Sequence, residues 1–353
     1  MKPTLTTAAA IALAGLTAAG AALAQTSAEP MAKPTAQMQA VLDKLGELGA
    51  KPLGTLSVAE TRAQPTPADA VKAVMADEKI AVPEAVAAVK TRDFTIPGAD
   101  GPVPARIYTP ASGDGPFPVI VYYHGGGWVI ANIDVYDASP RALVAGTDAV
   151  VVAVSYRQAP EFKFPAAHDD AIAAYQWIVE HSGELNGDST KIALVGESAG
   201  GNLAANVAIA ARDRGWTQPL LQVLVYPIAG NDLKTPSYQE NAEAKPLGRD
   251  GMAWFFEQAF ATPDQTADPR LNLVARTDLA GLPPALVINA QIDPLRSEGE
   301  VYAKALTAAG VPVTQKTYAN VTHEFFGMGP VLDEARDAEA LATTALRKAF
   351  GTD

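Results

Sequence analysis

The chain has 353 residues, of which 48% are hydrophobic, and it carries 27 basic against 39 acidic side chains, for a net charge of -12. This length suits one large α/β domain with an appended cap, or two small domains, and the composition is typical of a globular protein with a sizeable core. The negative charge disfavours nucleic acid and anionic lipid as partners. Because the chain contains no cysteine, a disulfide, a thiolate nucleophile and a zinc-thiolate site are excluded.

The N-terminus has the pattern of a secretory signal peptide. Lys2 is the only charged residue of the segment, an apolar run follows from about 8 to 19, and Ala22-Leu23-Ala24 offers a cleavage site before Gln25. The run is too short and too rich in alanine to span a bilayer, so we expect no stable membrane anchor. We therefore predict a signal peptide over residues 1–24 and an exported mature chain, periplasmic or secreted, after cleavage near Ala24.

Beyond this segment the hydrophobic pattern first indicates helices and then an alternation of strands and helices. Apolar residues at helical spacing predict helices near 38–48 and 68–75, within an N-terminal helical segment over residues 25–88. From Val89 onward, runs of β-branched and aromatic residues predict strands. The predicted strands cover 89–96, 103–108, 119–123, 149–154, 192–195, 220–226, 285–289 and 311–318. The predicted helices between and after them cover about 139–145, 169–181, 202–212, 298–309 and 332–350.

Strands that alternate with helices predict a largely parallel sheet covered on both faces, and we assign residues 89–353 to this α/β domain. Residues 230–274 interrupt the alternation with proline, asparagine, aspartate and a cluster of aromatic side chains. This segment is long for a connection within a sheet, so we interpret it as a mostly helical insertion. The insertion and the segment 25–88 are the candidates for a cap over the site.

The stretch Gly196-Glu197-Ser198-Ala199-Gly200-Gly201 lies between a predicted buried strand and a predicted helix. Glycines two residues before and two residues after a serine, in this context, are typical of a nucleophile elbow. The tight turn presents the hydroxyl to substrate. The helix that follows directs its N-terminal amides toward negative charge that develops on a substrate oxygen. We therefore predict Ser198 as a nucleophile.

A serine hydroxyl attacks a carbonyl carbon efficiently only when a base accepts its proton and an acid orients that base. In an α/β hydrolase these groups come in the order serine, acid, histidine, each at the end of a strand. Asp293 follows the strand after the insertion, and His323 follows the next strand. We predict Ser198, Asp293 and His323 as the catalytic residues.

Other titratable residues fit this order less well. His124 precedes the serine in a glycine loop, and His168 lies in a connection rich in phenylalanine and proline. Glu298 and Glu300 would replace Asp293 only from inside a helix. Residues that suit helix ends better than catalysis are Asp169, Asp170 and His181.

Main-chain amides at two loops predict an oxyanion hole. The strand 119–123 leads directly into Gly125, Gly126 and Gly127, whose amides lie at the carboxyl end of the strand, where open α/β sheets bind ligands. The amide of Ala199 at the elbow is the second predicted donor. Which of the three glycines point inward stays open at this point.

Four motifs together resemble those of the bacterial hormone-sensitive-lipase-like carboxylesterases of the α/β-hydrolase superfamily. They are His124–Trp128, Tyr156–Glu161, Gly196–Gly201, and Asp293–Arg296 with Glu298 just after it. Their order and spacing agree with the family from about Gln37 to Leu346. The resemblance implies an eight-stranded sheet, a cap drawn from the N-terminal helices and residues 230–274, and hydrolysis of short-chain carboxylic esters without a cofactor or a metal.

The sequence departs from the family pattern at five positions. These are Gln158 for leucine, Glu197 for aspartate, Ser297 for an acidic residue, Asn320 for a common glycine, and Glu324 for the glycine of His-Gly-Phe. None removes a predicted catalytic residue, but Glu324 places a carboxylate beside the base and bears on pocket shape and substrate preference there. The aromatic candidates for the substrate pocket are Trp128, Trp254, Phe255, Phe256, Phe325 and Phe326.

We therefore predict a serine carboxylesterase that hydrolyses a small-molecule ester through an acyl-serine intermediate. One alternative is an amidase or lactonase of the same fold, which would use the same chemistry. Another is a non-catalytic ligand-binding protein on a hydrolase scaffold, although such a protein is expected to have lost the base, and His323 is present. The oligomeric state, including a homodimer, stays open.

Overall fold

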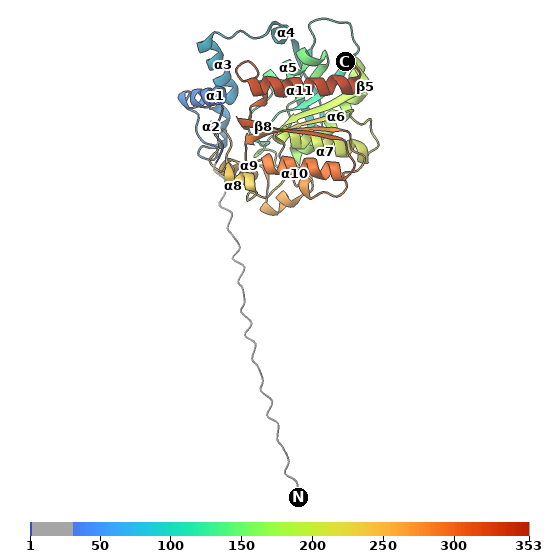
Figure 1. The fold of residues 1–353 in the computed structure, drawn as a ribbon. Coiled ribbons are helices and arrows are strands. Elements are labelled where there is room, and N and C mark those ends of the chain that lie inside the picture. Colours follow the sequence, from blue (N-terminus) through green and yellow to red (C-terminus); the bar gives the residue numbers. More distant parts are fainter. Residues whose placement is uncertain (2–30, 353) are drawn as a thin grey trace.

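A single sheet of eight strands crosses the centre of the molecule (Figure 1). The computed structural model describes Met1 and residues 31–352, so the predicted signal peptide lies outside the described residues. The strands are β1 (Lys90–Gly98), β2 (Gly101–Thr109), β3 (Phe117–Tyr123), β4 (Val150–Val154), β5 (Gly187–Glu197), β6 (Gln222–Val225), β7 (Ala285–Ile292) and β8 (Val313–Thr322). Their order is β1-β2-β4-β3-β5-β6-β7-β8.

Most neighbouring strands run parallel. Strand β2 runs antiparallel to both of its neighbours, β1 on one side and β4 on the other. The remaining pairs, from β4-β3 to β7-β8, are parallel. A parallel order requires crossover connections, and helices supply them on both faces. The mostly parallel sheet with its helical layers confirms the predicted fold class.

Helices cover both faces of the sheet and bury its apolar side chains. On one face lie α5 (Ala138–Thr147) and α11 (Asp333–Phe350); on the other lie α6 (Ala166–Glu180), α7 (Ala199–Asp213) and α10 (Arg296–Ala308) (Figure 1). Alternate residues of β3 enter the two resulting cores. Ile120 packs in the core with α5 and α11, whereas Val119 and Val121 pack in the core with α6 and α7. This two-sided burial explains why β3 is apolar throughout.

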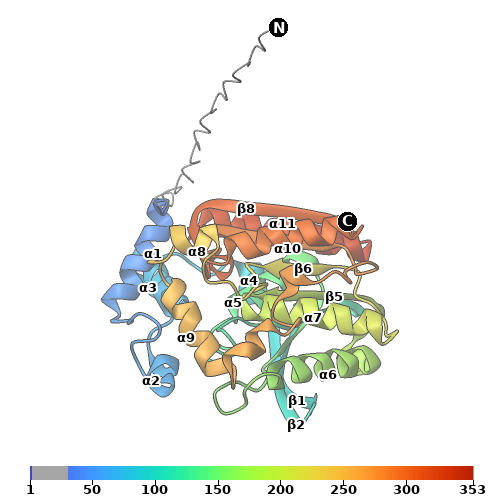
Figure 2. The same cartoon turned by 90° about the horizontal axis from the view of Figure 1, so that it is seen from below.

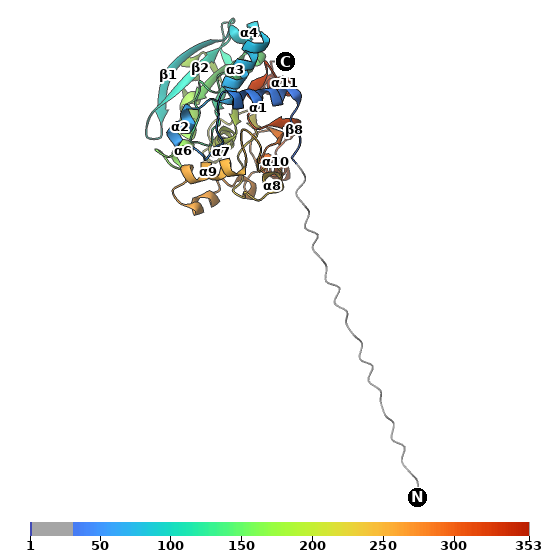
Figure 3. The same cartoon turned by 90° about the vertical axis from the view of Figure 1, so that its left-hand side faces the viewer.

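The first three N-terminal helices and the insertion lie together at one end of the molecule (Figures 1 and 2), which faces the viewer in Figure 3, whereas the fourth N-terminal helix lies beside α5. The N-terminal helices are α1 (Ala36–Glu47), α2 (Val58–Ala63), α3 (Pro67–Glu78) and α4 (Glu84–Ala87). The insertion contains α8 (Pro236–Glu240), α9 (Arg249–Ala259) and the 3-10 turns η2 (Pro263–Ala267) and η3 (Leu273–Ala275). None of the helices within residues 31–352 combines the length and the apolar character that crossing a bilayer requires.

The fold differs from the sequence prediction in several places, among them helix α2 and the ends of β7 and β8. Helix α2 was not predicted because it is only six residues long. Ser57 caps its N-terminus: the Ser57 hydroxyl accepts a hydrogen bond from the amide of Glu60, and the Glu60 carboxylate accepts one from the amide of Ser57. Strands β7 and β8 also end later than predicted, at Ile292 and Thr322. Asp293 and His323 therefore come directly after the strand ends.

Candidate active site

Ser198 occupies the sharp turn between β5 and α7. Its backbone has a φ of 56° and a ψ of -117°, a conformation that a non-glycine residue rarely adopts. The turn is possible because Gly196 and Gly200 lack side chains: a Cβ atom at Gly196 would collide with the carbonyl of Gly200, and one at Gly200 with the carbonyl of Tyr123. Main-chain hydrogen bonds hold the turn, including one of 2.9 Å from the Ser198 amide to the Val225 carbonyl.

Two hydrogen bonds connect the three predicted catalytic residues. His323 Nε2 lies 2.9 Å from Ser198 Oγ, and His323 Nδ1 lies 2.7 Å from Asp293 Oδ2. Since a carboxylate only accepts hydrogen bonds, Nδ1 carries the proton and leaves Nε2 free to accept the serine proton. The other carboxylate oxygen of Asp293 accepts the Leu295 amide at 2.8 Å, which fixes the acid. The structure thus brings together residues from three distant parts of the chain.

The surroundings of His323 favour its protonated form. Burial alone would lower the pKa of the imidazole, but the charge and hydrogen bond of Asp293, followed by the charges of Glu324 and Glu197, raise the pKa above its ordinary value of 6.5. All three catalytic side chains are buried, at 3% exposure or less. In this site an imidazolium is stabilised when His323 takes up a proton from Ser198.

The glycine loop lies beside the serine, as an oxyanion hole requires. Gly126 and Gly127 have φ values of 97° and 59°, which turn the chain back after β3. Of the three predicted glycines, Gly126 lines the cavity that contains Ser198 and His323. Among the described residues, the amides of Gly126 and Ala199 donate no hydrogen bond to another protein group. The amides of Gly125 and Gly127 donate none within this part of the chain either, so the position of Gly126 on the cavity wall and that of Ala199 directly after the nucleophile mark these two amides as the candidate donors to a substrate oxygen.

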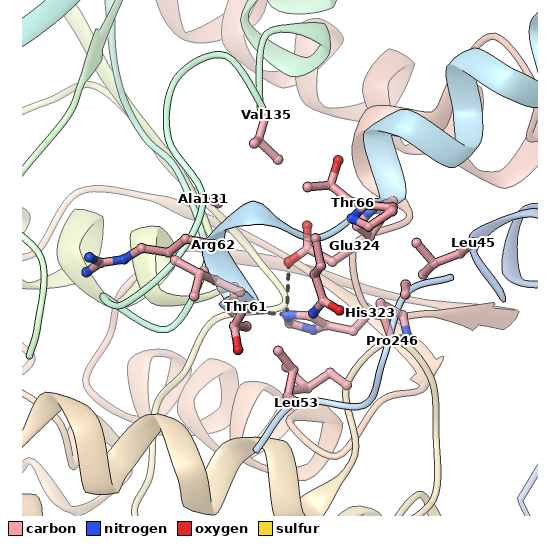
Figure 4. Close-up of a pocket in the computed structure, with 18 of the residues that line it drawn as sticks. Leu45, Leu53, Thr61, Arg62, Thr66, Ala131, Val135, Pro246, His323 and Glu324 are labelled. Atoms are coloured by element: carbon pink, nitrogen blue, oxygen red, sulfur yellow. Dashed lines mark hydrogen bonds and ion pairs between the residues drawn. The ribbon is translucent and has the colours of Figure 1, made fainter. Parts of the chain in front are cut away.

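A cavity of about 290 Å³ opens above the catalytic side chains (Figure 4). Besides Ser198, its wall comes from five regions: residues 45–67 of the N-terminal segment, the glycine loop with the residues that follow it, Gln158 after β4, the insertion, and the loop after β8. The N-terminal segment contributes Leu45, Leu53 and Thr66, and the insertion contributes Pro246, Leu247 and Phe255. Both segments that were predicted as cap candidates therefore contribute to the wall.

Of the six predicted pocket aromatics, Phe255 lines this cavity and five lie elsewhere. Trp128 packs edge-on against Phe260, and Phe256 also packs against Phe260. Trp254 lines a neighbouring hollow between the N-terminal segment and the insertion. Phe325 and Phe326 are fully buried in the core beside α11. The structure therefore does not place these five side chains on the wall of this cavity, because an aromatic run indicates burial, and burial alone does not say which side chains face a cavity.

Glu324 and Tyr136 form a polar pair on the cavity wall. The Tyr136 hydroxyl lies 2.7 Å from both carboxylate oxygens of Glu324, and Glu324 Oε1 lies 3.6 Å from His323 Nε2. Burial raises the pKa of Glu324, although the charge of His323 and the hydrogen bond from Tyr136 oppose this shift. Tyr136 was not predicted because it lies far from Glu324 in the sequence. The departure from glycine at position 324 was the only signal of this pair.

Glu197, another departure from the family pattern, lies beneath the site. Its carboxylate accepts hydrogen bonds of 2.5 Å from the hydroxyls of Tyr122 and Tyr226, and the Tyr226 ring centroid lies 4.5 Å from that of His323. Burial raises the pKa of Glu197 to about 7, against hydrogen bonds from Ser139 and the two tyrosines. Glu197 therefore holds Tyr226 against the catalytic imidazole.

The rejected candidates are held by other contacts. His124 stacks on Tyr156, with ring centroids 4.5 Å apart, and His168 Nε2 lies 2.8 Å from the side-chain oxygen of Asn202. Asp170 is buried against Arg157 as an ion pair, so it does not act as a helix cap. Glu298 accepts the Ala229 amide at 2.8 Å. In the part of the chain that the structure describes, no three acidic or histidine side chains form a metal-binding cluster.

Comparisons with known proteins point to one group of enzymes. A family described as alpha/beta hydrolase fold matches residues 120–327. A carboxylesterase of Mycobacterium tuberculosis is 41% identical over 232 residues, which cover 65% of this chain and 72% of the relative. An ethyl acetate hydrolase of Pseudomonas putida is 35% identical over 226 residues, or 64% of this chain and 71% of that protein. A solved hyperthermophilic esterase of Pyrobaculum calidifontis superimposes with a TM-score of 0.80 at 37% identity, covering 90% of this chain and 99% of its own.

Proposed function

This chain belongs to the hormone-sensitive-lipase-like carboxylesterases of the α/β-hydrolase superfamily, and we propose that it hydrolyses short-chain carboxylic esters through an acyl intermediate on Ser198. The observation that carries the proposal is the pair of hydrogen bonds that runs from Asp293 through His323 to Ser198 on the wall of the cavity. The cavity volume of about 290 Å³ is near the lower limit for small-molecule sites, which favours a small ester.

In the acylation step, Ser198 Oγ attacks the carbonyl carbon of the ester while His323 Nε2 accepts the hydroxyl proton. Asp293 stabilises the resulting imidazolium through its contact with Nδ1. Negative charge moves to the former carbonyl oxygen, where the amides of Gly126 and Ala199 can donate to it. When the intermediate collapses, the carbon–oxygen bond to the alcohol breaks, and His323 returns its proton to the alcohol oxygen.

Deacylation repeats these steps with water as the nucleophile. His323 Nε2 accepts a proton from the water, the resulting hydroxide attacks the acyl carbon, and the bond to Ser198 Oγ breaks as the proton returns to the serine. The carboxylic acid then leaves. Because the same imidazole serves both halves of the reaction, its position between Ser198 and Asp293 must hold throughout.

Replacing Ser198 with alanine tests the proposal. Hydrolysis of p-nitrophenyl butyrate should fall by roughly 10⁴- to 10⁶-fold, as expected when the nucleophile of a triad is removed. A fluorophosphonate probe should label the wild-type serine and leave Ser198→Ala unlabelled. Undiminished turnover by the variant would refute the assignment of Ser198. A faster reaction with the matching anilide than with the ester would favour an amidase.

We also propose that the mature chain is exported. The support is the signal-peptide pattern of residues 1–24, with its single charge at Lys2 and its cleavage motif ending at Ala24. N-terminal sequencing of protein from the native host should give a start near Gln25, and an intact Met1 would refute the proposal.

A further inference from the structure

Glu324 is a carboxylate on the cavity wall with spare capacity to accept hydrogen bonds. The Tyr136 hydroxyl contacts both of its oxygens at 2.7 Å, but a hydroxyl carries only one hydrogen, whereas a carboxylate accepts about four. Tyr136 is the only donor to this carboxylate among the described residues. The side chain is 19% exposed and lines the cavity, so its remaining acceptor sites are available on the cavity side (Figure 4).

The backbone at this position is strained. Glu324 has a φ of 73°, in the left-handed region where glycine is favoured, and the family pattern has glycine here. Strained residues persist where the surrounding structure fixes them, and they cluster at functional sites. The strained backbone and the spare acceptor capacity of the carboxylate are separate observations, and both point to a role for Glu324 in binding a ligand.

The reaction geometry places Glu324 beside the alcohol part of the ester. His323 Nε2 must return a proton to the leaving alcohol oxygen, which brings that oxygen within about 2.6–3.2 Å of the nitrogen. Glu324 Oε1 lies 3.6 Å from the same nitrogen. A polar group two or three bonds beyond the ester oxygen is therefore within reach of the carboxylate.

The charges around the cavity favour a cation at this place. The imidazolium formed during the reaction lies between two carboxylates, Asp293 and Glu324. Arg62 also lines the cavity, but its guanidinium pairs with Glu161 at 2.7 Å and donates to two main-chain carbonyls. Lys51, the remaining basic residue of the wall, is exposed. If the alcohol part of the ester carried a negative charge, the Glu324 carboxylate would repel it.

We propose that Glu324 determines specificity by selecting esters whose alcohol part carries a hydrogen-bond donor, a hydroxyl or an ammonium group, two or three bonds from the ester oxygen. The same carboxylate disfavours alcohols that carry an anion. This inference rests on the proposed function, since it assigns the alcohol side of the cavity from the role of His323.

Butyrate esters of similar shape and different charge test the inference. In 2-(dimethylamino)ethyl, 3-methylbutyl and 2-carboxyethyl butyrate the alcohols are close in size but are cationic, neutral and anionic near neutral pH. We expect kcat/KM to rise about tenfold from the neutral to the cationic ester and to fall about tenfold for the anionic ester, as a charge contact at a partly solvated site implies. The pair of 2-hydroxyethyl and propyl butyrate tests the hydroxyl. A preference for both donors identifies the hydrogen bond as the selecting contact, and a preference for the ammonium alone identifies the charge.

Two variants remove the carboxylate by different routes. Glu324→Gln keeps the shape of the side chain, and Glu324→Gly suits the positive φ, so at least the glycine variant is expected to fold. Both should bring the cationic-to-neutral ratio of kcat/KM close to one. A general loss of activity or stability cancels in this ratio. The matched control is Tyr136→Phe, which removes the donor to Glu324 but retains the carboxylate, and which should retain the preference.

The inference is overturned if the wild-type enzyme prefers neither donor, or if both Glu324 variants retain the wild-type ratios. Hydrolysis of 3-methylbutyl butyrate by Ser198→Ala separates this failure from that of the proposed function. Turnover that depends on Ser198 with unchanged ratios would refute only the role of Glu324. Turnover that persists without Ser198 would refute the proposed function itself.

Discussion

The catalytic side chains and the cavity wall that faces them are built in different ways. Ser198, Asp293 and His323 each follow directly on the end of a sheet strand, and the hydrogen bonds between them are 2.9 Å or shorter. The wall instead comes from several segments far apart in the sequence, including the N-terminal segment, the glycine loop with the residues after it, and the insertion, and contacts such as that of Tyr136 with Glu324 join them. The sheet therefore determines the chemistry, and the surrounding segments determine which ester can enter.

The largest expected effect on activity is at the catalytic residues that follow the strand ends. Changing Asp293 to Asn removes the charge that holds His323 and favours the wrong imidazole tautomer, so kcat should fall roughly 10⁴-fold. Ester hydrolysis measured under saturating substrate gives this value, and circular dichroism checks that the variant is folded. A loss of less than tenfold would mean that Asp293 does not orient the base.

A smaller effect is expected at the wall, where two neighbouring phenylalanines form a matched pair. Phe255 lines the cavity and packs against Gly127, whereas Phe256 packs against Phe260. Both are buried, so each change to alanine should lower stability by about 3–5 kcal/mol. Only Phe255→Ala should shift activity severalfold toward larger esters in a series of p-nitrophenyl esters. Equal activity profiles for the two variants would show that the wall at α9 does not select substrate.

The smallest expected effect is a shift in the pH profile. His323 acts as a base only when neutral, so kcat/KM should fall as the pH drops below its pKa, which Asp293, Glu324 and Glu197 raise. The acid limb should therefore lie above the ordinary histidine value of 6.5. Because Glu324→Gln removes one of these charges, it should move the limb to lower pH. Ethyl butyrate, which does not titrate, is the substrate for this measurement, and an unmoved limb would contradict the coupling of Glu324 to the base.

The sequence was sufficient to predict the catalytic residues at the carboxyl ends of the strands, but it was insufficient to predict which residues line the cavity. Ser198, Asp293 and His323 each follow a strand that the sequence predicts. Because the carboxyl ends of parallel strands lie on the same side of a sheet, the sequence also predicts that these residues lie close together. The wall depends on packing between distant segments. Tyr136 had no local signal, α2 was too short for a periodic pattern, and Phe255 differed from Phe256 only in the direction of its side chain. Glu324 was visible as a departure from a family pattern, but its partner was not.

The structure of the enzyme after reaction with a short-chain alkyl phosphonate tests the central claim most directly, because the adduct imitates the charged intermediate at the serine. The account predicts a bond from phosphorus to Ser198 Oγ, with one phosphoryl oxygen within hydrogen-bond distance of the amides of Gly126 and Ala199 and His323 Nε2 facing the leaving-group position. Phosphorus bound to another residue, or a phosphoryl oxygen directed away from both amides, would contradict it.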